Sequence, residues 1–424
     1  MARKMKDSGI EWIGEIPEGW EIKYFVQLFS QVKNKNIGLC EKNLLSLSYG
    51  KIKQKSIETV GGLLPDNFEG YNIIDRNDIV LRLTDLQNDQ HSLRVGLSHE
   101  RGIITSAYCS IRVRGAESPN YLYYYLHTFD IAKGFYGMGS GVRQGLNWDG
   151  LKYIKILLPP QHEQDRISVF LNQKTLEIDS MLSKTISSIE EYKKLKQAVI
   201  TQAVTKGVRG EREMKDSGVE WIGEIPAEWS ICPLKRLAAI QTGSTPSKTS
   251  SESFYSSITG TPWIKPDNLG FSSSIETTAE FLTEEGCSVA RTFPSNTVYV
   301  GCIGSRIGNC GYSLIPCACN QQINALIFNE RMYWKYGWYL TIFQEEQYTL
   351  LANGNVIQII NSTTQGNISC IVPSISEQRE ITAYLDAKCA EIDGLIAKKE
   401  QLAKELESYK KSLIYEVVTG KREV

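Results

Sequence analysis

The stretch Met5–Pro17, MKDSGIEWIGEIP, returns almost unchanged as Met214–Pro226, MKDSGVEWIGEIP, 209 positions later. A second pair of segments, Pro159–Gly207 and Pro373–Gly420, matches at a shift of 214, whereas the residues between the matched segments share little. Self-similarity at a fixed shift is the mark of one architecture built twice. Repeated frames around dissimilar bodies predict that the two copies hold two different specificities.

The composition predicts a globular chain with two or three domains. It has 424 residues, of which 42% are hydrophobic. The N-terminal MARKMKDSGIEW lacks the apolar core of a signal peptide, and no window approaches the roughly 18 to 20 apolar residues that a membrane span needs. The ten cysteines are scattered, as in a reducing compartment. We therefore expect a cytoplasmic protein with buried thiols and no membrane partner.

The two closing segments predict long helices. Glu163–Val204 contains neither Gly nor Pro, prolines precede each segment, and Gly207 and Gly420 stand where helices would stop. Ser374 and Glu377 have the spacing of an N-terminal capping box. Roughly 40 residues at about 1.5 Å each would make every helix on the order of 60 Å long.

Both closing segments carry an apolar stripe with alternating steps of three and four, interrupted by Thr185, Lys196 and Lys399, which indicates a coiled-coil seam. The seam residues are Ile178, Leu182, Ile189, Tyr192 and Val199, then Ile392, Leu395, Leu402, Leu406, Tyr409 and Leu413. Because the copies are equivalent, we expect the helices to pair as an antiparallel coiled coil about a pseudo-twofold axis. A seam that pairs two copies of the chain is the alternative.

The bodies between the frames predict a mixed fold. Short apolar runs indicate the strands Asp78–Leu83, Ala107–Arg112, Thr297–Ile303 and Asn324–Phe328, and aromatic-rich helices follow at Tyr121–Phe129 and Tyr336–Phe343. The expected fold class is therefore α/β in the mixed α+β sense, with two globular domains separated by two long antiparallel helices. The expected domains are residues 1–158 and 209–372, with spacer helices at 159–208 and 373–424.

No catalytic motif is present in the sequence. It has no Gly-x-x-x-x-Gly-Lys-Ser/Thr loop, no Gly-x-Ser-x-Gly elbow and no His-Glu-x-x-His pair, and Gly137–Gly141 misses the dinucleotide spacing. One cysteine cluster could bind zinc, but it lacks Cys-x-x-Cys pairs and favours core thiols: Cys302, Cys310, Cys317 and Cys319. We expect no catalytic residue, no bound metal and no bound cofactor.

Polar loops are the remaining candidates for a function, because Arg, Asn, Gln, Asp and Ser match the base edges of the major groove. In the first body the candidates for DNA contact are Arg82, Thr84, Asp85, Asn88, Arg94, Arg143 and Gln144. In the second body they are Lys265, Asp267, Asn268, Ser305, Arg306, Asn320, Gln321 and Gln358. An ordinary polar surface is the alternative, and composition alone favours it.

A third repeat strengthens the DNA interpretation. Ser140–Asn147 aligns with Gly354–Asn361 at the same shift of 214, and the two segments share Val, Gln and Asn. Gln144 and Gln358 therefore occupy equivalent places just before the strand that leads into each long helix. A backbone contact and a structural turn are both compatible with this repeat.

Together these features resemble the specificity subunit of a type I restriction-modification system, over nearly the full length. The W-I-G-E-I-P-x-x-W motif occurs at Trp12–Trp20 and Trp221–Trp229, and P-x-x-x-E-Q opens each long helix at Pro159–Gln164 and Pro373–Gln378. The second body also contains G-C-I-G-S followed by N-Q-Q-I-N-A-L-I. Each motif alone is weak, and the combination is specific.

The resemblance implies that each body is a target recognition domain reading one half of a bipartite, asymmetric sequence in double-stranded DNA. It implies that the helices separate the bodies and dock two modification subunits. The chain itself would be non-catalytic, directing adenine-N6 methylation by those subunits and ATP-dependent cleavage by two restriction subunits where the system has them. S-adenosylmethionine, ATP and Mg²⁺ would be used by these partners in the cytoplasm of a bacterium or archaeon.

The charge of the chain restricts how it could bind DNA. The net charge of −1 excludes attraction by bulk positive charge. Residues 1–158 carry 20 Lys and Arg against 17 Asp and Glu, whereas residues 209–372 carry 11 against 15, so phosphate attraction in the second body must come from few residues or from the partners. The alternative functions are a coiled-coil protein scaffold without DNA specificity and an enzyme with a site at the cysteine cluster.

Overall fold

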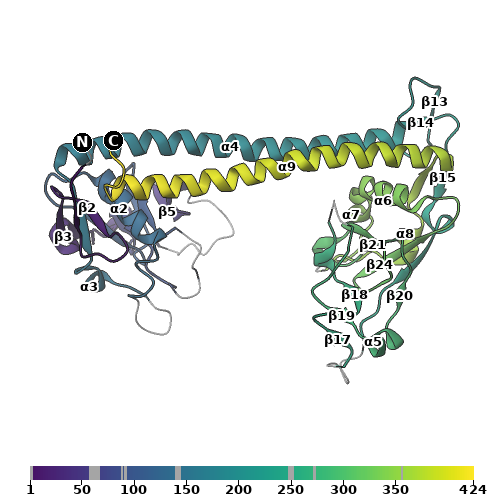
Figure 1. The fold of residues 1–424 in the computed structure, drawn as a ribbon, viewed down its shortest axis with the longest axis horizontal. Helices are drawn as coiled ribbons and strands as arrows, with labels where there is room; N and C mark the ends of the chain where they lie inside the picture. The colour runs from purple at the N-terminus through teal and green to yellow at the C-terminus, as the bar shows by residue number, and fades with distance from the viewer. Residues whose placement is uncertain are drawn as a thin grey trace. The chain divides into compact units, whose positions relative to one another are not determined.

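The computed structural model describes residues 3–56, 67–86, 89, 93–138, 145–246, 253–270, 274–354 and 357–424. The chain forms two compact units, Met1–Ile186 with Glu400–Val424 (unit 1) and Ser187–Lys399 (unit 2). Each unit contains one mixed α+β body, the start of one long helix and the end of the other (Figure 1). The predicted fold class, mixed bodies with two long helices, is confirmed.

The long helices are α4 (Gln161–Lys206) and α9 (Ile375–Val418) (Figure 1). Each is followed by a glycine in the left-handed region, Gly207 at φ 77° and Gly420 at φ 74°, which ends the helix as predicted. The predicted capping box is only half formed. The Ser374 hydroxyl accepts the Glu377 amide at 3.3 Å, but the Glu377 carboxylate bonds to Trp229 instead.

The ends of the two helices pack antiparallel within each unit. In unit 1 the hydroxyl of Tyr121 donates to the carbonyls of Leu157, just before α4, and Val418, at the end of α9. In unit 2 the hydroxyl of Tyr336 donates in the same way to Ile371, just before α9, and Val204, near the end of α4. The aromatic-rich helix of each body therefore ties one helix start to the other helix end.

The predicted seam residues are all buried or partly buried on α4, whereas on α9 only half of them are. On α4 the side chains of Ile178 and Ile189 are buried, and Leu182, Tyr192 and Val199 are partly buried. On α9, Ile392 and Leu413 are buried and Leu406 is partly buried, as predicted.

The other predicted α9 positions face solvent: Leu395 is 36%, Leu402 44% and Tyr409 49% exposed. The next residue along the chain takes each of these places and is less exposed in each case: Ile396, Ala403 and Lys410. These three positions match the α4 seam at the shift of 214, so the two helices use one heptad pattern. The prediction followed hydrophobicity, because Leu402 and Tyr409 are larger and more apolar than the residues that take their places.

Two lysines in the seam form matching ion pairs across the helices. In unit 2, Lys196 of α4 contacts Asp393 of α9 at 2.8 Å. In unit 1, Lys410 of α9 contacts Asp179 of α4 at 2.5 Å, and both lysine and aspartate positions repeat at the shift of 214. A charged residue at a seam position costs stability but specifies one register, because any slip leaves the charge unpaired.

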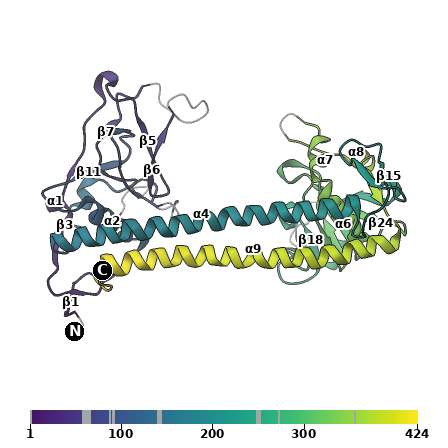
Figure 2. The same cartoon turned by 90° about the horizontal axis from the view of Figure 1, so that it is seen from above.

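The described part of unit 1 contains two four-stranded sheets and two short ribbons. The sheets have strand orders β6-β5-β10-β7 and β4-β11-β8-β9, and the ribbons pair β1 with β2 and β3 with β12. The strands are β1 (Met5–Asp7), β2 (Glu15–Pro17), β3 (Glu21–Tyr24), β4 (Phe29–Gln31), β5 (Leu44–Ser48), β6 (Lys51–Lys55), β7 (Asn72–Ile74), β8 (Ile79–Leu81), β9 (Val95–Leu97), β10 (Gly102–Ile104), β11 (Cys109–Val113) and β12 (Lys155–Leu158). The helices of the body are α1 (Phe25–Leu28), α2 (Pro119–Ile131) and α3 (Trp148–Leu151). The sheet containing β5 and β6 lies to one side of α4 in Figure 2.

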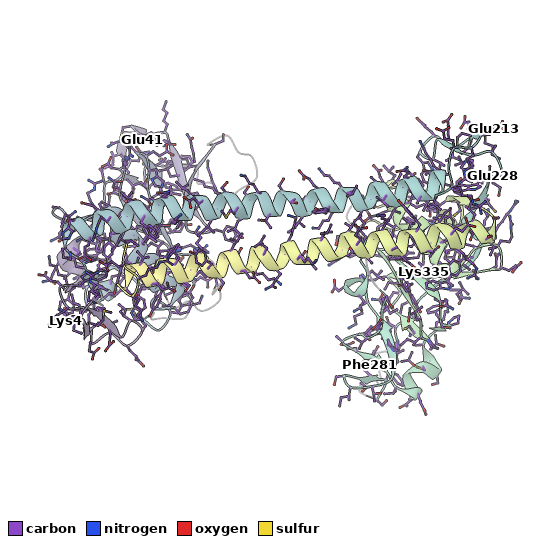
Figure 3. All side chains as sticks on the ribbon, turned by 45° about the horizontal axis from the view of Figure 1, so that its top comes forward. Lys4, Glu41, Glu213, Glu228, Phe281 and Lys335 are labelled. Carbon is purple, nitrogen blue, oxygen red and sulfur yellow. The ribbon has the colours of Figure 1, made fainter. Side chains whose placement is uncertain are left out.

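Unit 2 repeats this plan with a four-stranded sheet β16-β24-β21-β22 and a five-stranded sheet β17-β19-β18-β23-β20. Its strands are β13 (Met214–Asp216), β14 (Glu224–Pro226), β15 (Ser230–Pro233), β16 (Ala238–Thr242), β17 (Tyr255–Ser256), β18 (Thr261–Ile264), β19 (Phe281–Leu282), β20 (Thr292–Phe293), β21 (Thr297–Gly301), β22 (Cys310–Ser313), β23 (Cys317–Cys319), β24 (Ile323–Phe328) and β25 (Ser369–Val372). Its helices are α5 (Glu284–Val289), α6 (Trp334–Phe343), α7 (Glu345–Leu350) and α8 (Ser362–Gly366). Figure 3 places Lys335 of α6 beside α9, where it contacts Asp386 at 2.7 Å, and Phe281 at the end of the unit far from the helices.

The predicted strands and aromatic helices of both bodies are confirmed as β8, β11, β21, β24, α2 and α6. The four-stranded sheets are equivalent, because β8 pairs with β11 and β9 as β21 pairs with β24 and β22. The second sheet of each body differs in strand number and order. The repeat therefore extends from the frames into the sheet that packs on them.

A glutamate at the start of each long helix, buried in the case of Glu377 and partly buried in the case of Glu163, binds the opening motif to the helix. The Trp229 indole donates to the Glu377 carboxylate at 2.8 Å, and Arg212 contacts the same carboxylate at 2.6 Å while lying over the Trp229 ring. Arg3, Trp20 and Glu163 repeat this arrangement in unit 1. We call these two arrangements the carboxylate clamps. They give a structural role to the second tryptophan of each W-I-G-E-I-P-x-x-W motif and to the glutamate of each P-x-x-x-E-Q motif.

Glu377→Gln should lower the free energy of unfolding by about 1 to 3 kcal/mol, because it removes the charge that Arg212 pairs with while leaving the buried site polar. The measurement is urea denaturation followed by tryptophan fluorescence. Glu380→Gln is the matched control, since Glu380 lies on the same helix and its contacts with Arg209 and Ser376 are exposed. Equal effects of the two substitutions would contradict the clamp.

Candidate nucleic-acid interface

Four polar loops of unit 2 meet where β18 and β21 end. The Asn320 amide donates to the Ile264 carbonyl at 3.1 Å, and the Cys302 amide donates to the Gln322 carbonyl at 2.8 Å. The Gly304 amide donates to the Gln358 carbonyl at 2.9 Å. The candidate residues after β18, after β21, before β24 and before β25 therefore belong to one connected surface, although its first and last members lie far apart in the sequence.

Several side chains of this surface are paired with one another. Lys265 lies over the Trp263 ring and contacts Glu280 at 2.7 Å, and the Asn268 side chain accepts the Lys265 amide at 2.9 Å. Arg306 approaches Asp267 at 3.4 Å, which links the loop after β21 to the loop after β18.

The remaining candidates of unit 2 lie at the rim of the same surface. Ser305, Gln321 and Gln358 are exposed, and Asn320 donates to the side chain of Gln322. Gln321 also accepts a hydrogen bond from Thr245, which sequence reasoning missed. The surface is thus a set of amides, hydroxyls and cations held by neighbouring loops.

Unit 1 builds the corresponding surface after β8. The Leu146 amide donates to the Leu83 carbonyl at 2.9 Å, as the Ile360 amide donates to the Cys302 carbonyl at 2.9 Å in unit 2. Two residues further along, Asp85 has φ 58° and Gly304 has φ 78°. A positive φ is rare outside glycine, although Asp tolerates it better than most residues, so the two loops share a backbone turn that their sequences conceal.

The candidates of unit 1 divide into three groups. Thr84 is exposed, Asp85 is partly exposed, and Arg82 lies 3.6 Å from Asp89. Asn88, Arg143 and Gln144 lie outside the described residues, and their contacts with DNA stay predictions. Arg94 alone makes up the third group.

Arg94 is fully buried, which corrects the prediction that it contacts DNA. Its guanidinium donates to backbone carbonyls of the loop after β8, including those of Arg82 at 3.1 Å and Thr84 at 2.8 Å. Its own amide donates to Asp130 at 2.7 Å. Burial raises the pKa of Asp130 to about 6, although the Arg94 amide and charge lower it. Sequence reasoning assigned Arg94 from residue type alone, which cannot distinguish a base contact from a loop support.

The asparagine shared by the third repeat has a structural role. Asn147 and Asn361 are N-terminal caps, whose side chains accept the amides of Gly150 at 3.2 Å and Thr364 at 2.8 Å. These caps fix the short helices α3 and α8 just before the strands that lead to α4 and α9. In the described part of the repeat, the asparagines are therefore structural, and the Gln358 carbonyl accepts the Gly304 amide.

The four clustered cysteines are buried in the core of unit 2. Burial raises the pKa of the Cys302 thiol to about 11 and also raises that of Cys310 and Cys319. Within the described ranges, no group of three His, Cys, Asp or Glu side chains could hold a metal ion. The cysteines thus pack as small apolar side chains.

Acidic partners of the candidate cations were missed by the sequence reasoning. Glu280 reaches Lys265 because the Trp263 amide donates to the Glu280 carbonyl beside β18. No local spacing connects the two residues, which are 15 positions apart. Only strand pairing brings them together, so the sequence carries no short-range signal for the pair.

The family model for the type I restriction modification DNA specificity domain matches residues 226–407. The type I restriction enzyme MjaVIII specificity subunit of Methanocaldococcus jannaschii is 24% identical over 96% of this chain and 93% of its own length. The MjaX specificity subunit of the same organism is 24% identical over 96% and 95%.

Solved structures show the same fold. A chain from a structure on complex assembly and conformational transition of the type I R-M system has a TM-score of 0.72 at 15% identity, covering 96% of this chain and 99% of its own. The HsdS subunit from Thermoanaerobacter tengcongensis has a TM-score of 0.50 at 15% identity, covering 96% and 98%. Among the described helices of the present chain, none has the length and apolar character to cross a membrane.

Proposed function

Because the chain belongs to the specificity subunits of type I restriction-modification systems, we propose that its two units read the two halves of one bipartite DNA target. The observation that carries this proposal is the pair of equivalent loop surfaces, closed by the same backbone contacts at Leu83 and Cys302 but lined by different side chains. Two loops held by equivalent backbone contacts but carrying different side chains are suited to recognise two different DNA sequences. The chain is the DNA-recognition component and is not itself an enzyme.

The base-reading residues are those of the two loop surfaces. In unit 2, Arg306, Lys265 and Ser305 can donate to base edges, whereas Gln321 and Gln358 can both donate and accept. In unit 1, Arg82 and Thr84 lie in the loop after β8 and can likewise donate to base edges. Three further residues of unit 1 belong to the proposed base-reading set: Asn88, Arg143 and Gln144. Four others contact bases or hold the base-reading side chains in place: Asp85, Asp267, Asn268 and Asn320.

Docking of the modification subunits occurs on the outer face of the paired helices. In unit 1, Met181 and Tyr409 are 54% and 49% exposed; in unit 2, Leu395 and Leu195 are 36% and 48% exposed. Met181 and Leu395 are equivalent at the shift of 214, as are Leu195 and Tyr409. Two equivalent apolar surfaces fit two copies of one partner, which would supply the adenine-N6 methyl transfer with S-adenosylmethionine.

Restriction subunits, where present, would add ATP- and Mg²⁺-dependent cleavage to the complex. We propose that the specificity subunit itself holds none of these cofactors and acts in the cytoplasm on double-stranded DNA. Its contribution is to choose the adenines that the modification subunits reach.

Selection from random duplexes tests the proposal directly. The chain, purified with its modification subunits, should retain duplexes that share two short sequence elements at one fixed separation. A coiled-coil scaffold without DNA specificity would give no enriched sequence. Mapping of methylated adenines in a host with and without the gene should return the same two elements.

Arg306→Ala should cost about 1 to 3 kcal/mol of binding free energy on the selected target and relax the preference at one base pair, if Arg306 pairs with a guanine. Arg331→Ala is the matched control, because Arg331 is also exposed in unit 2 but lies outside the loop surface. Binding is measured across single-base variants at fixed salt. A loss that is uniform over all variants would reassign Arg306 to a phosphate.

Removal of residues 186–192 from α4 together with 397–403 from α9 should shorten the separation between the half-sites. Seven residues at about 1.5 Å each correspond to roughly 10 Å, or about three base pairs. Each segment is one heptad long, so the pairs that Lys196 makes in unit 2 and Lys410 makes in unit 1 keep their register. Duplex selection with the shortened protein measures the new separation, and an unchanged value would mean that the helices do not set it.

A further inference from the structure

All five N–H donors of the Arg94 guanidinium have acceptors in unit 1. Nε donates to the Tyr136 hydroxyl at 3.0 Å, and one terminal nitrogen donates to the carbonyls of Arg82 and Thr84. The other terminal nitrogen donates to the carbonyls of Asp85, at 3.2 Å, and Asp89. A buried charged group with every donor satisfied is a fixed structural centre.

The described residues of the loop after β8, 82–86 and 89, lie around this guanidinium. Four of its carbonyls point inward to Arg94, so the exposed side of the loop is left to side chains such as that of Thr84. The turn includes Asp85 in the left-handed region, a conformation that its contacts must maintain. The Arg82 amide in turn donates to the Arg94 carbonyl at 2.9 Å, which closes the base of the loop.

The equivalent loop of unit 2 is held by its own backbone. The Gly301 amide donates to Asn309 at 2.8 Å, the Gly308 amide to Gly301 at 3.1 Å, and the Asn309 amide to Arg306 at 3.1 Å. That loop is short, running from β21 to β22 over residues 302–309. The loop of unit 1 is longer, spanning residues 82–94, and beside its backbone bonds from Arg82 to Arg94 and from Asp89 to Asp85 it has the Arg94 guanidinium as a common donor to four of its carbonyls.

We propose that Arg94 is a positioning residue that sets the base preference of unit 1 by holding residues 82–86 and 89 in one conformation. The proposal rests on the reading function of that loop. A lysine would keep the charge but offers three donors on a flexible stem instead of five in a rigid plane. Arg94→Lys should therefore release part of the loop without removing the buried cation.

The test uses the full chain assembled with its modification subunits and a set of duplexes in which each base of each half-site is changed. Single-turnover methylation rates give the discrimination at each position. The half-site read by unit 2 is the one that Arg306→Ala alters. Arg94→Lys should reduce discrimination at the other half-site about tenfold or more, while discrimination at the unit 2 half-site stays within about twofold.

Arg101→Lys is the matched control, because Arg101 is an exposed arginine of unit 1 that pairs with Glu41 and Asp75 away from the loop. It should leave both half-sites unchanged. Discrimination by Arg94→Lys that is intact at both half-sites, or lost equally at both, would overturn the proposal. If the unsubstituted complex discriminates at neither half-site, the proposed function itself fails.

Tyr136→Phe decides the question if Arg94→Lys does not assemble. It removes only the hydroxyl that accepts from Nε and keeps the ring over which the guanidinium lies at 5.0 Å. We expect a loss of a few fold in discrimination, confined to the unit 1 half-site. Unchanged discrimination at that half-site would count against the positioning role.

Discussion

The carboxylate at the first turn of each long helix is the constraint on which the frame depends. Glu377 accepts from Trp229 and pairs with Arg212, and Glu163 does the same with Trp20 and Arg3. Each clamp joins the opening segment of a unit to a helix start that lies 143 or 148 positions beyond its tryptophan. It also takes the glutamate away from its ordinary capping role, and that loss is offset by two stronger, charge-assisted contacts. With the helix start fixed, the aromatic helix and the returning helix end can pack on it.

Repeated support and variable contact occupy different parts of each unit. The tyrosine hydroxyls of Tyr121 and Tyr336, the caps Asn147 and Asn361, and the lysines of the seam are the same in both copies. The loops that follow β8 and β21 are not: four carbonyls of the first accept from a buried arginine, whereas the second is bridged by the amides of Gly301, Gly308 and Asn309. The same position in the frame therefore tolerates two different ways of making a rigid loop.

The sequence predicted the features that repeat and missed those that depend on long-range pairing. The two long helices, the glycines that end them and the main strands were predicted from hydrophobic periodicity and from the positions of glycine and proline. The α9 seam was half wrong because hydrophobicity favours Tyr409 over Lys410, whereas Lys410 has an aspartate partner on the opposite helix. Arg94 was assigned to DNA because its residue type suggested a base contact, whereas its burial follows from the tertiary structure. The pairing of Glu280 with Lys265 could not be predicted, because only strand pairing brings the two residues together. The sequence predicted which loops form the candidate surfaces, but it did not predict the contacts among their side chains.

The ribbon that closes each body has a consequence for how the chain accommodates change. β3 pairs with β12 from Tyr24 opposite Lys155 to Glu21 opposite Leu158, and β15 pairs with β25 in the same manner. The first and last residues of a body are thus neighbours, as in an inserted domain whose ends meet at one point. A body that begins and ends on such a ribbon, and keeps the tyrosine that bonds to the long helices, can vary elsewhere without moving the frame. The two bodies already differ in length by five residues, and new ones could be grafted without redesign of the helices.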